Sequence, residues 1–80
     1  MISIPIPRLV IVSPCYNEEA ILAYSARELT TLLERLITAG KILPTSHVLY
    51  VNDGSRDRTW ELIEELHREN HFIDGLCLAG

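Results

Sequence analysis

The sequence lacks a basic cluster and a long apolar run, and both absences exclude classes of protein. Seven Lys and Arg residues stand against eleven Asp and Glu residues, for a formal net charge of −4. Without a Lys/Arg cluster to neutralise phosphates, the chain is not expected to bind nucleic acid. No apolar stretch approaches the roughly 20 residues of a membrane-spanning helix. The start, MISIPIPRLVIV, has no basic segment and contains two prolines, so it does not resemble a secretory signal peptide.

The sequence has too few cysteines for a disulfide framework, and its glycines are not placed as in a dinucleotide fingerprint or a P-loop. Cys15 and Cys77 cannot make a disulfide framework, and both lie in apolar runs where a reduced, buried thiol is expected. Reduced thiols favour a cytoplasmic location. Cys15 could be a nucleophile at a helix N-terminus, but no histidine is near it in the sequence. The Gly-rich dinucleotide fingerprint and the P-loop are both excluded, because neither glycine pattern occurs.

What is present is an alternation of strand and helix patterns. Residues 9–12 and 48–51 are continuous apolar runs rich in β-branched side chains, typical of strands buried on both faces of a parallel sheet. Residues 18–39 and 58–69 repeat apolar side chains every three or four positions, which predicts two helices. Residues 72–78 form a third strand candidate. The order β-α-β-α-β predicts an α/β fold with three neighbouring parallel strands.

Local signals mark the ends of both predicted helices. Asn17 is a plausible N-cap of the first helix, and Gly40 is a plausible stop after it. Ser55 or Asp57 could cap the second helix in the same way. Each polar loop is therefore expected to end in a helix N-terminus.

Two polar loops, SPCYNEE and NDGSRD, follow the first two strands. Ligands of open parallel sheets bind at the carboxyl ends of the strands, so we expect the two loops to face each other across one site. Tyr16 could stack on a planar base, or be a hydrophobic anchor. Asp53 could accept a hydrogen bond from a base or ribose, or close an Asx turn. Glu18 could accept from a base or help to position a metal, or only complement the helix dipole.

A calcium loop is an alternative for the second segment. DGSRDRTWELIE has oxygen-bearing side chains at positions 1, 3, 5, 7, 9 and 12 of an EF-hand loop. These residues are Asp53, Ser55, Asp57, Thr59, Glu61 and Glu64. Position 6, where the loop needs glycine, is Arg58, and the preceding run is strand-like rather than helical. Both features disfavour calcium binding.

Taken together, VIVSPCYNEEAIL and VLYVNDGSRDRTWELIEEL resemble the start of a family 2 glycosyltransferase of the GT-A fold. The resemblance covers nearly the whole chain, and it is greatest to the polyprenyl-phosphate and dolichyl-phosphate sugar transferases. It implies the first half of a Rossmann-like nucleotide-binding domain, with three parallel strands. It also implies that Pro14 and Tyr16 line the nucleotide base and that Val51 packs near it. Glu18 and Asp53 match the carboxylates that contact the nucleotide and its base.

The departures from the family pattern limit what the chain is expected to do. Asn52 stands where the family's Asp-Asp-Gly-Ser motif has its first Asp. The Asp-x-Asp motif that holds Mg²⁺ or Mn²⁺ on the diphosphate does not occur after Asp53, and the family's catalytic base is also missing. We therefore expect no catalytic residue and no metal ligand in residues 1–80. The expected role is nucleotide-sugar binding without transfer by these residues alone.

The resemblance also implies partners. The donor would be a nucleoside diphosphate sugar, in the first place a UDP-sugar, and the acceptor a polyprenyl phosphate. The chain ends in a strand pattern, so residues 1–80 are expected to be the N-terminal part of a longer protein. Such a protein would lie in the cytoplasm at the inner face of a membrane, which it would contact only through later segments. The alternative is an inactive truncated fragment whose exposed third-strand edge makes it associate.

Overall fold

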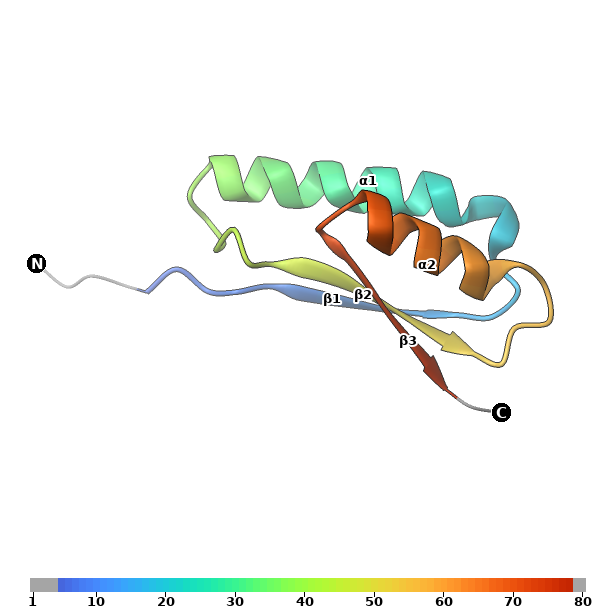
Figure 1. Cartoon of the computed structure of the whole chain (residues 1–80). Helices are drawn as coiled ribbons and strands as arrows, with labels where there is room; N and C mark the ends of the chain where they lie inside the picture. The colour runs from blue at the N-terminus through green and yellow to red at the C-terminus, as the bar shows by residue number, and fades with distance from the viewer. Residues whose placement is uncertain (1–4, 79–80) are drawn as a thin grey trace, which may run out of the picture.

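A computed structural model describes residues 5–78 of the chain. The backbone forms three strands and two helices in the predicted alternation (Figure 1). In chain order these are β1 (Val10–Cys15), α1 (Glu19–Thr38), β2 (His47–Asp53), α2 (Thr59–Glu69) and β3 (Ile73–Leu78). The α/β fold predicted from the sequence is confirmed.

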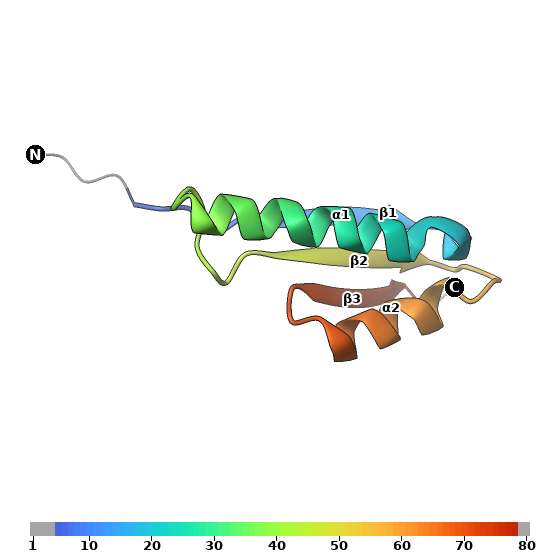
Figure 2. The ribbon, with the colours of Figure 1, turned by 90° about the horizontal axis from the view of Figure 1, so that it is seen from above.

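The three strands make one parallel sheet in the order β1-β2-β3. Both helices lie on the same face of it, with α1 along β1 and β2 and with α2 alongside β3 (Figure 2). Two crossovers of the same hand require this when spatial order follows chain order. The register aligns Cys15 with Asn52, so β1 and β2 end side by side. The loops that follow these strands therefore leave the same edge of the sheet.

The hydrophobic core fills the space between the sheet and the helices. Its fully buried side chains come from every element except β1: Leu22 and Leu33, Val48 and Tyr50, Ile63, and Ile73. Gly75 on β3 allows α2 to approach closely. A Cβ atom at that position would lie 2.5 Å from Cγ2 of Ile63 and 3.2 Å from the Trp60 ring. A glycine is needed here for space rather than for backbone freedom.

The C-terminus of α1 confirms the stop predicted at Gly40. This residue has a φ of 72°, in the left-handed region. Its amide donates to the carbonyl of Ile37, and the next amide, of Lys41, donates to the carbonyl of Leu36. These bonds form a Schellman motif, which satisfies carbonyls that the helix end leaves open.

The opposite face of the sheet corrects one prediction. Apolar runs suggested strands buried on both faces, yet no helix of residues 5–78 covers this side (Figure 1). Val12 is 59% exposed, and Leu76 and Leu78 on β3 are about half exposed. Cys77, predicted to be buried, is also exposed. Neither helix within residues 5–78 is long and apolar enough to cross a membrane.

Candidate functional site

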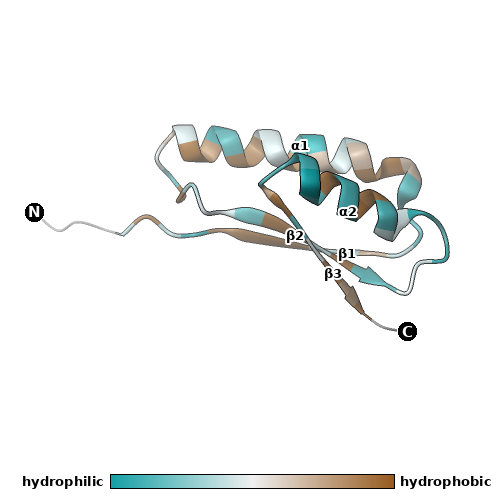
Figure 3. Ribbon diagram, in the orientation of Figure 1, coloured by the Kyte–Doolittle hydropathy of each residue, from teal (hydrophilic) through white to brown (hydrophobic). Residues whose placement is uncertain are grey.

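The loops after β1 and β2 are bonded to each other at the carboxyl edge of the sheet. The amide of Asn17 donates to Oγ of Ser55 over 3.0 Å, and the amide of Arg56 donates to Oδ1 of Asn17 over 2.8 Å. Figure 3 shows that the end of β2 and the loop after it are hydrophilic, in contrast to the strands. The sequence prediction that the two loops face each other is thus matched by direct contacts.

Asn17 does not have the capping role predicted for it. The residue flanking α1 is Glu18, which makes no side-chain cap, and Asn17 has a φ of 52°. Asparagine tolerates this left-handed backbone better than most residues. Its carboxamide is engaged by the opposite loop, so it turns the chain and ties the loops together instead of capping the helix.

The first amides of α1 are capped from the other loop. The amide of Glu18 donates to Oγ1 of Thr59 over 2.8 Å, and that of Glu19 donates to Oδ2 of Asp57 over 3.3 Å. Residues about 40 positions away therefore supply the acceptors that a helix start needs. Thr59 is fully buried and is the first residue of α2, so the N-termini of both helices meet at these contacts.

Asp57 bridges the two helix starts. Its Oδ2 accepts from Glu19, while its Oδ1 accepts from the amide of Thr59 over 2.9 Å and from the Thr59 hydroxyl. The hydroxyl bond is the largest cause of a lowered pKa of this carboxyl, and the amide bonds act in the same direction. The residue flanking α2 is Arg58, which makes no side-chain cap, so neither predicted residue holds the cap position. Asp57 nevertheless accepts from the first amide of α2, whereas Ser55 accepts from Asn17 instead.

The five residues implied to bind nucleotide divide into two groups by position. The first group lies on the uncovered face of the sheet near its carboxyl edge and consists of Pro14, Val51 and Asp53. Pro14 on β1 is paired with Val51 on β2. Asp53 lies two residues after Val51 on β2 and therefore points to the same face. Tyr16 and Glu18 flank Asn17 in the first loop, and the Tyr16 ring is 56% exposed. The side chain of Asp53 is exposed and makes no hydrogen bond or ion pair within residues 5–78.

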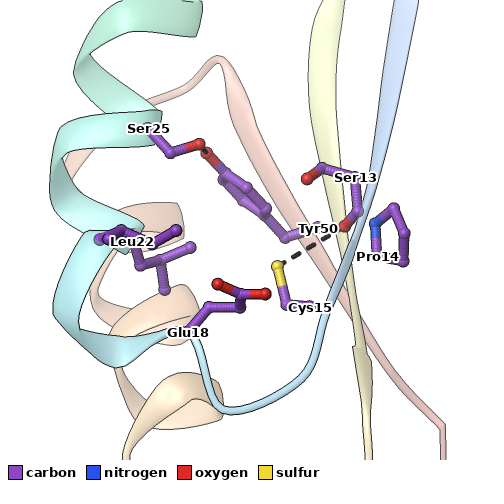
Figure 4. Close-up of a pocket in the computed structure, with 8 residues that line it drawn as sticks. Ser13, Pro14, Cys15, Glu18, Leu22, Ser25 and Tyr50 are labelled. Atoms are coloured by element: carbon purple, nitrogen blue, oxygen red, sulfur yellow. Dashed lines mark hydrogen bonds between the residues drawn. The ribbon is translucent and has the colours of Figure 1, made fainter.

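A cavity of about 130 Å³ lies between the end of β1 and the first turns of α1 (Figure 4). Pro14 and Glu18 line it, whereas Tyr16, Val51 and Asp53 do not. At its inner end the hydroxyl groups of Ser25 and Tyr50 are 2.8 Å apart and hydrogen-bonded. Burial raises the pKa of the Tyr50 hydroxyl, so this group stays protonated and can share a hydrogen bond.

Cys15 also lines the cavity, but its surroundings do not make it a nucleophile. Burial raises the pKa of its thiol, and the nearby carboxylate of Glu18 raises it further. The thiol donates weakly to the carbonyl of Ser13 over 3.6 Å (Figure 4). A protonated thiol is a weak nucleophile, which disfavours the covalent role considered from the sequence.

Asn52 has a structural role at the end of β2 that the sequence did not indicate. It is 3% exposed, its Oδ1 accepts from the amide of Ser55 over 3.4 Å, and its Nδ2 donates to Sγ of Cys77 over 3.4 Å. The turn predicted at Asp53 is therefore closed by Asn52. The Asn-Asp-Gly-Ser order indicates a turn, but this bond reaches three residues along the chain and not the two of an Asx turn, so the local rule did not identify it.

The described part of the chain does not form a metal centre. No group of three or more His, Cys, Asp and Glu side chains within residues 5–78 is arranged to hold a metal ion. Helix α2 begins at Thr59, so the later positions of the proposed calcium loop are helical, and both oxygens of Asp57 are engaged. These residues do not fit a metal ligand set, and no metal-dependent step is assigned to them.

Comparison with known proteins identifies the family of the chain. Residues 10–75 match the model of the family described as "Glycosyl transferase family 2", and the chain belongs to that family. It is similar to the "Uncharacterized glycosyltransferase YkoT" of Bacillus subtilis (strain 168), with 42% identity over 73 residues. The alignment covers 91% of this chain and 22% of that relative, so the chain spans less than a quarter of its length. No solved structure matches the chain significantly.

Proposed function

We propose that this chain is the nucleotide-binding, N-terminal part of a glycosyltransferase that transfers a sugar from a nucleoside diphosphate donor to an acceptor. Family membership supports sugar transfer as the activity of the whole protein. The observation that carries the assignment is the bonding of the two loops at the carboxyl edge, with the Asp53 carboxylate left exposed and unbonded beside them. That edge is where open α/β sheets bind nucleotides.

Each predicted site residue has a role that its surroundings allow. The exposed ring of Tyr16 stacks on the base. The carboxylates of Asp53 and Glu18 accept hydrogen bonds from base N–H groups or ribose hydroxyls. Pro14 and Val51 present apolar surface to the ligand on the uncovered sheet face. Together they recognise a nucleoside through one aromatic face, two acceptors and a hydrophobic floor.

The donor we propose is a UDP-sugar and the acceptor a polyprenyl phosphate, on the strength of the two sequence motifs. A protein of this kind works in the cytoplasm at the inner face of a membrane. Mg²⁺ or Mn²⁺ would neutralise charge on the leaving diphosphate. We assign to residues 1–80 the binding of the donor nucleotide and no step of the transfer itself.

Isothermal titration with UDP and, in parallel, with GDP tests this function. Asp53→Ala removes an acceptor for the nucleoside, and Glu34→Ala is the control, because Glu34 is an exposed carboxylate far along α1. We expect the unmodified chain and Glu34→Ala to bind UDP alike and Asp53→Ala to bind about tenfold or more weakly, as for a lost charge-assisted hydrogen bond. No binding of either nucleotide, or equal binding by all three proteins, would overturn the proposal.

The alternative of an inactive, self-associating fragment is supported by the half-exposed leucines of β3 at the edge of the sheet. Light scattering after size exclusion separates the two functions. A monomer that resists proteolysis and binds nucleotide supports the donor site. Concentration-dependent oligomers without nucleotide binding support the fragment.

A further inference from the structure

The side chains that join the two loops occupy a place where a phosphate would otherwise be expected. Backbone amides at the start of a helix point out of it and form an anion site if they are left open. In this chain the amides of Asn17, Glu18 and Glu19 donate to the side chains of Ser55, Thr59 and Asp57, respectively. The amide of Glu19, the first residue of α1, and the two amides before it are thus engaged by the protein itself and are not free to bind a diphosphate.

Asp57 carries the negative charge of this arrangement. Its carboxylate lies at the N-terminal, positive ends of both α1 and α2 and accepts from an amide of each. Neither oxygen of Asp57 is left without a donor, in contrast to the exposed carboxylate of Asp53 four residues earlier. The two carboxylates of one loop therefore differ in kind: one is engaged with the fold and the other is open to a ligand.

The contacts of Asp57 fix the distance between the two halves of the nucleotide site. Glu18 lies next to Glu19, whose amide Asp57 holds, and Tyr16 lies just before the turn at Asn17. Asp53 belongs to the loop that carries Asp57 itself. A loss of the Asp57 bonds leaves only the contacts of Asn17 and Thr59 between the loops, so the start of α1 is held less firmly relative to β2. Binding must then supply part of the ordering that the fold now supplies.

We propose that Asp57 is a positioning residue of the nucleotide site. It is a cap shared by the two helix starts, and it holds Tyr16 and Glu18 at the spacing from Asp53 that a nucleoside requires. Thr59 assists it through its hydroxyl, which binds Asp57 and the amide of Glu18 at once. This inference rests on the proposed function and deepens it, because Asp57 would act on the ligand only through other residues.

The test compares Asp57→Asn with Glu64→Gln, which makes the same chemical change at an exposed position of α2. Asparagine keeps the size of the side chain but has one acceptor oxygen instead of two. UDP affinity is measured by titration at a temperature at which circular dichroism shows every variant folded. We expect Asp57→Asn to bind UDP about five- to tenfold more weakly and Glu64→Gln to bind it unchanged, as for the loss of preorganisation by one charged contact.

A role in positioning is separated from a role in stability by repeating Asp57→Asn in an Asp53→Asn background. If Asp57 acts by setting the distance of Tyr16 and Glu18 from Asp53, then Asp57→Asn should reduce the UDP affinity less in the Asp53→Asn background than in the unmodified chain. A folded Asp57→Asn chain with unchanged affinity, or an equal loss in both backgrounds, overturns the inference and leaves the proposed function standing. If the unmodified chain binds neither UDP nor GDP, the proposed function falls, and this inference falls with it.

Discussion

The hydroxyl of Thr59 accepts a hydrogen bond from the backbone amide of Glu18, 41 residues earlier in the chain, over 2.8 Å. The contact joins the residue that precedes α1 to the first residue of α2. It is one of several that make the two polar loops a single unit at the carboxyl edge of the sheet.

Replacement of Thr59 by valine should destabilise the chain, and serine should restore most of the loss. Valine keeps the shape of the fully buried side chain but leaves the amide of Glu18 without its acceptor. Loss of this partly buried hydrogen bond costs about 1 kcal/mol in the free energy of unfolding. Urea denaturation of the three proteins measures the difference. Equal stability of Thr59→Val and the unmodified chain would show that this contact does not hold the loops.

The contribution of Asp57 to stability should disappear in acid. The folded state lowers the pKa of its carboxyl below the ordinary value of 3.8, so the carboxylate stabilises the fold at neutral pH. That contribution is present above the ordinary value and is lost as the pH falls through the lower, folded-state value. The difference in unfolding free energy between the unmodified chain and Asp57→Asn should therefore be greatest near neutrality and should vanish at low pH. A difference independent of pH would contradict the role of this carboxylate.

Addition of a methyl group at Gly75 should destabilise the packing of α2 on β3. The new Cβ would lie 2.5 Å from Cγ2 of Ile63, which is fully buried and cannot move freely. Overpacking of this kind costs about 1–3 kcal/mol. Thermal unfolding of Gly75→Ala measures the loss. In an Ile63→Ala background the same change should cost much less, and an undiminished cost would place the strain elsewhere.

The two cysteines should differ sharply in their reaction with iodoacetamide in the folded chain. Cys77 is exposed, whereas Cys15 is 4% exposed and burial raises the pKa of its thiol. Mass spectrometry after a short treatment should find the label on Cys77. Unfolding in urea should remove the difference. Early labelling of Cys15 would indicate that the end of β1 is open to solvent.

The sequence predicted the elements better than the contacts between them. Strands, helices and the stop at Gly40 follow from local patterns, because periodicity and glycine conformation act over a few residues. The exposure of Val12 and Cys77 was missed, since an apolar run indicates burial without showing what covers it. Which face of the sheet a helix covers depends on the topology of the whole chain.

At the candidate site, too, local features were easier to predict than contacts between distant residues. The residues proposed to contact a ligand were named from the motifs, but the partners of Asn17 could not be predicted. Its left-handed turn and its bonds to Ser55 and Arg56 join positions nearly 40 residues apart, and no local rule indicates such pairs. Asn17 was predicted to cap a helix because asparagine is a common cap.

The most direct test of the central claim is an amide NMR spectrum of the chain, recorded with and without UDP in the presence of Mg²⁺. The claim is that the loops after β1 and β2 form one nucleotide site. It predicts a dispersed spectrum in which UDP shifts the amides of Tyr16, Glu18 and Asp53, while those of residues 41–46 at the opposite edge stay in place. A dispersed spectrum that UDP leaves unchanged, or one shifted only at the opposite edge, would contradict it.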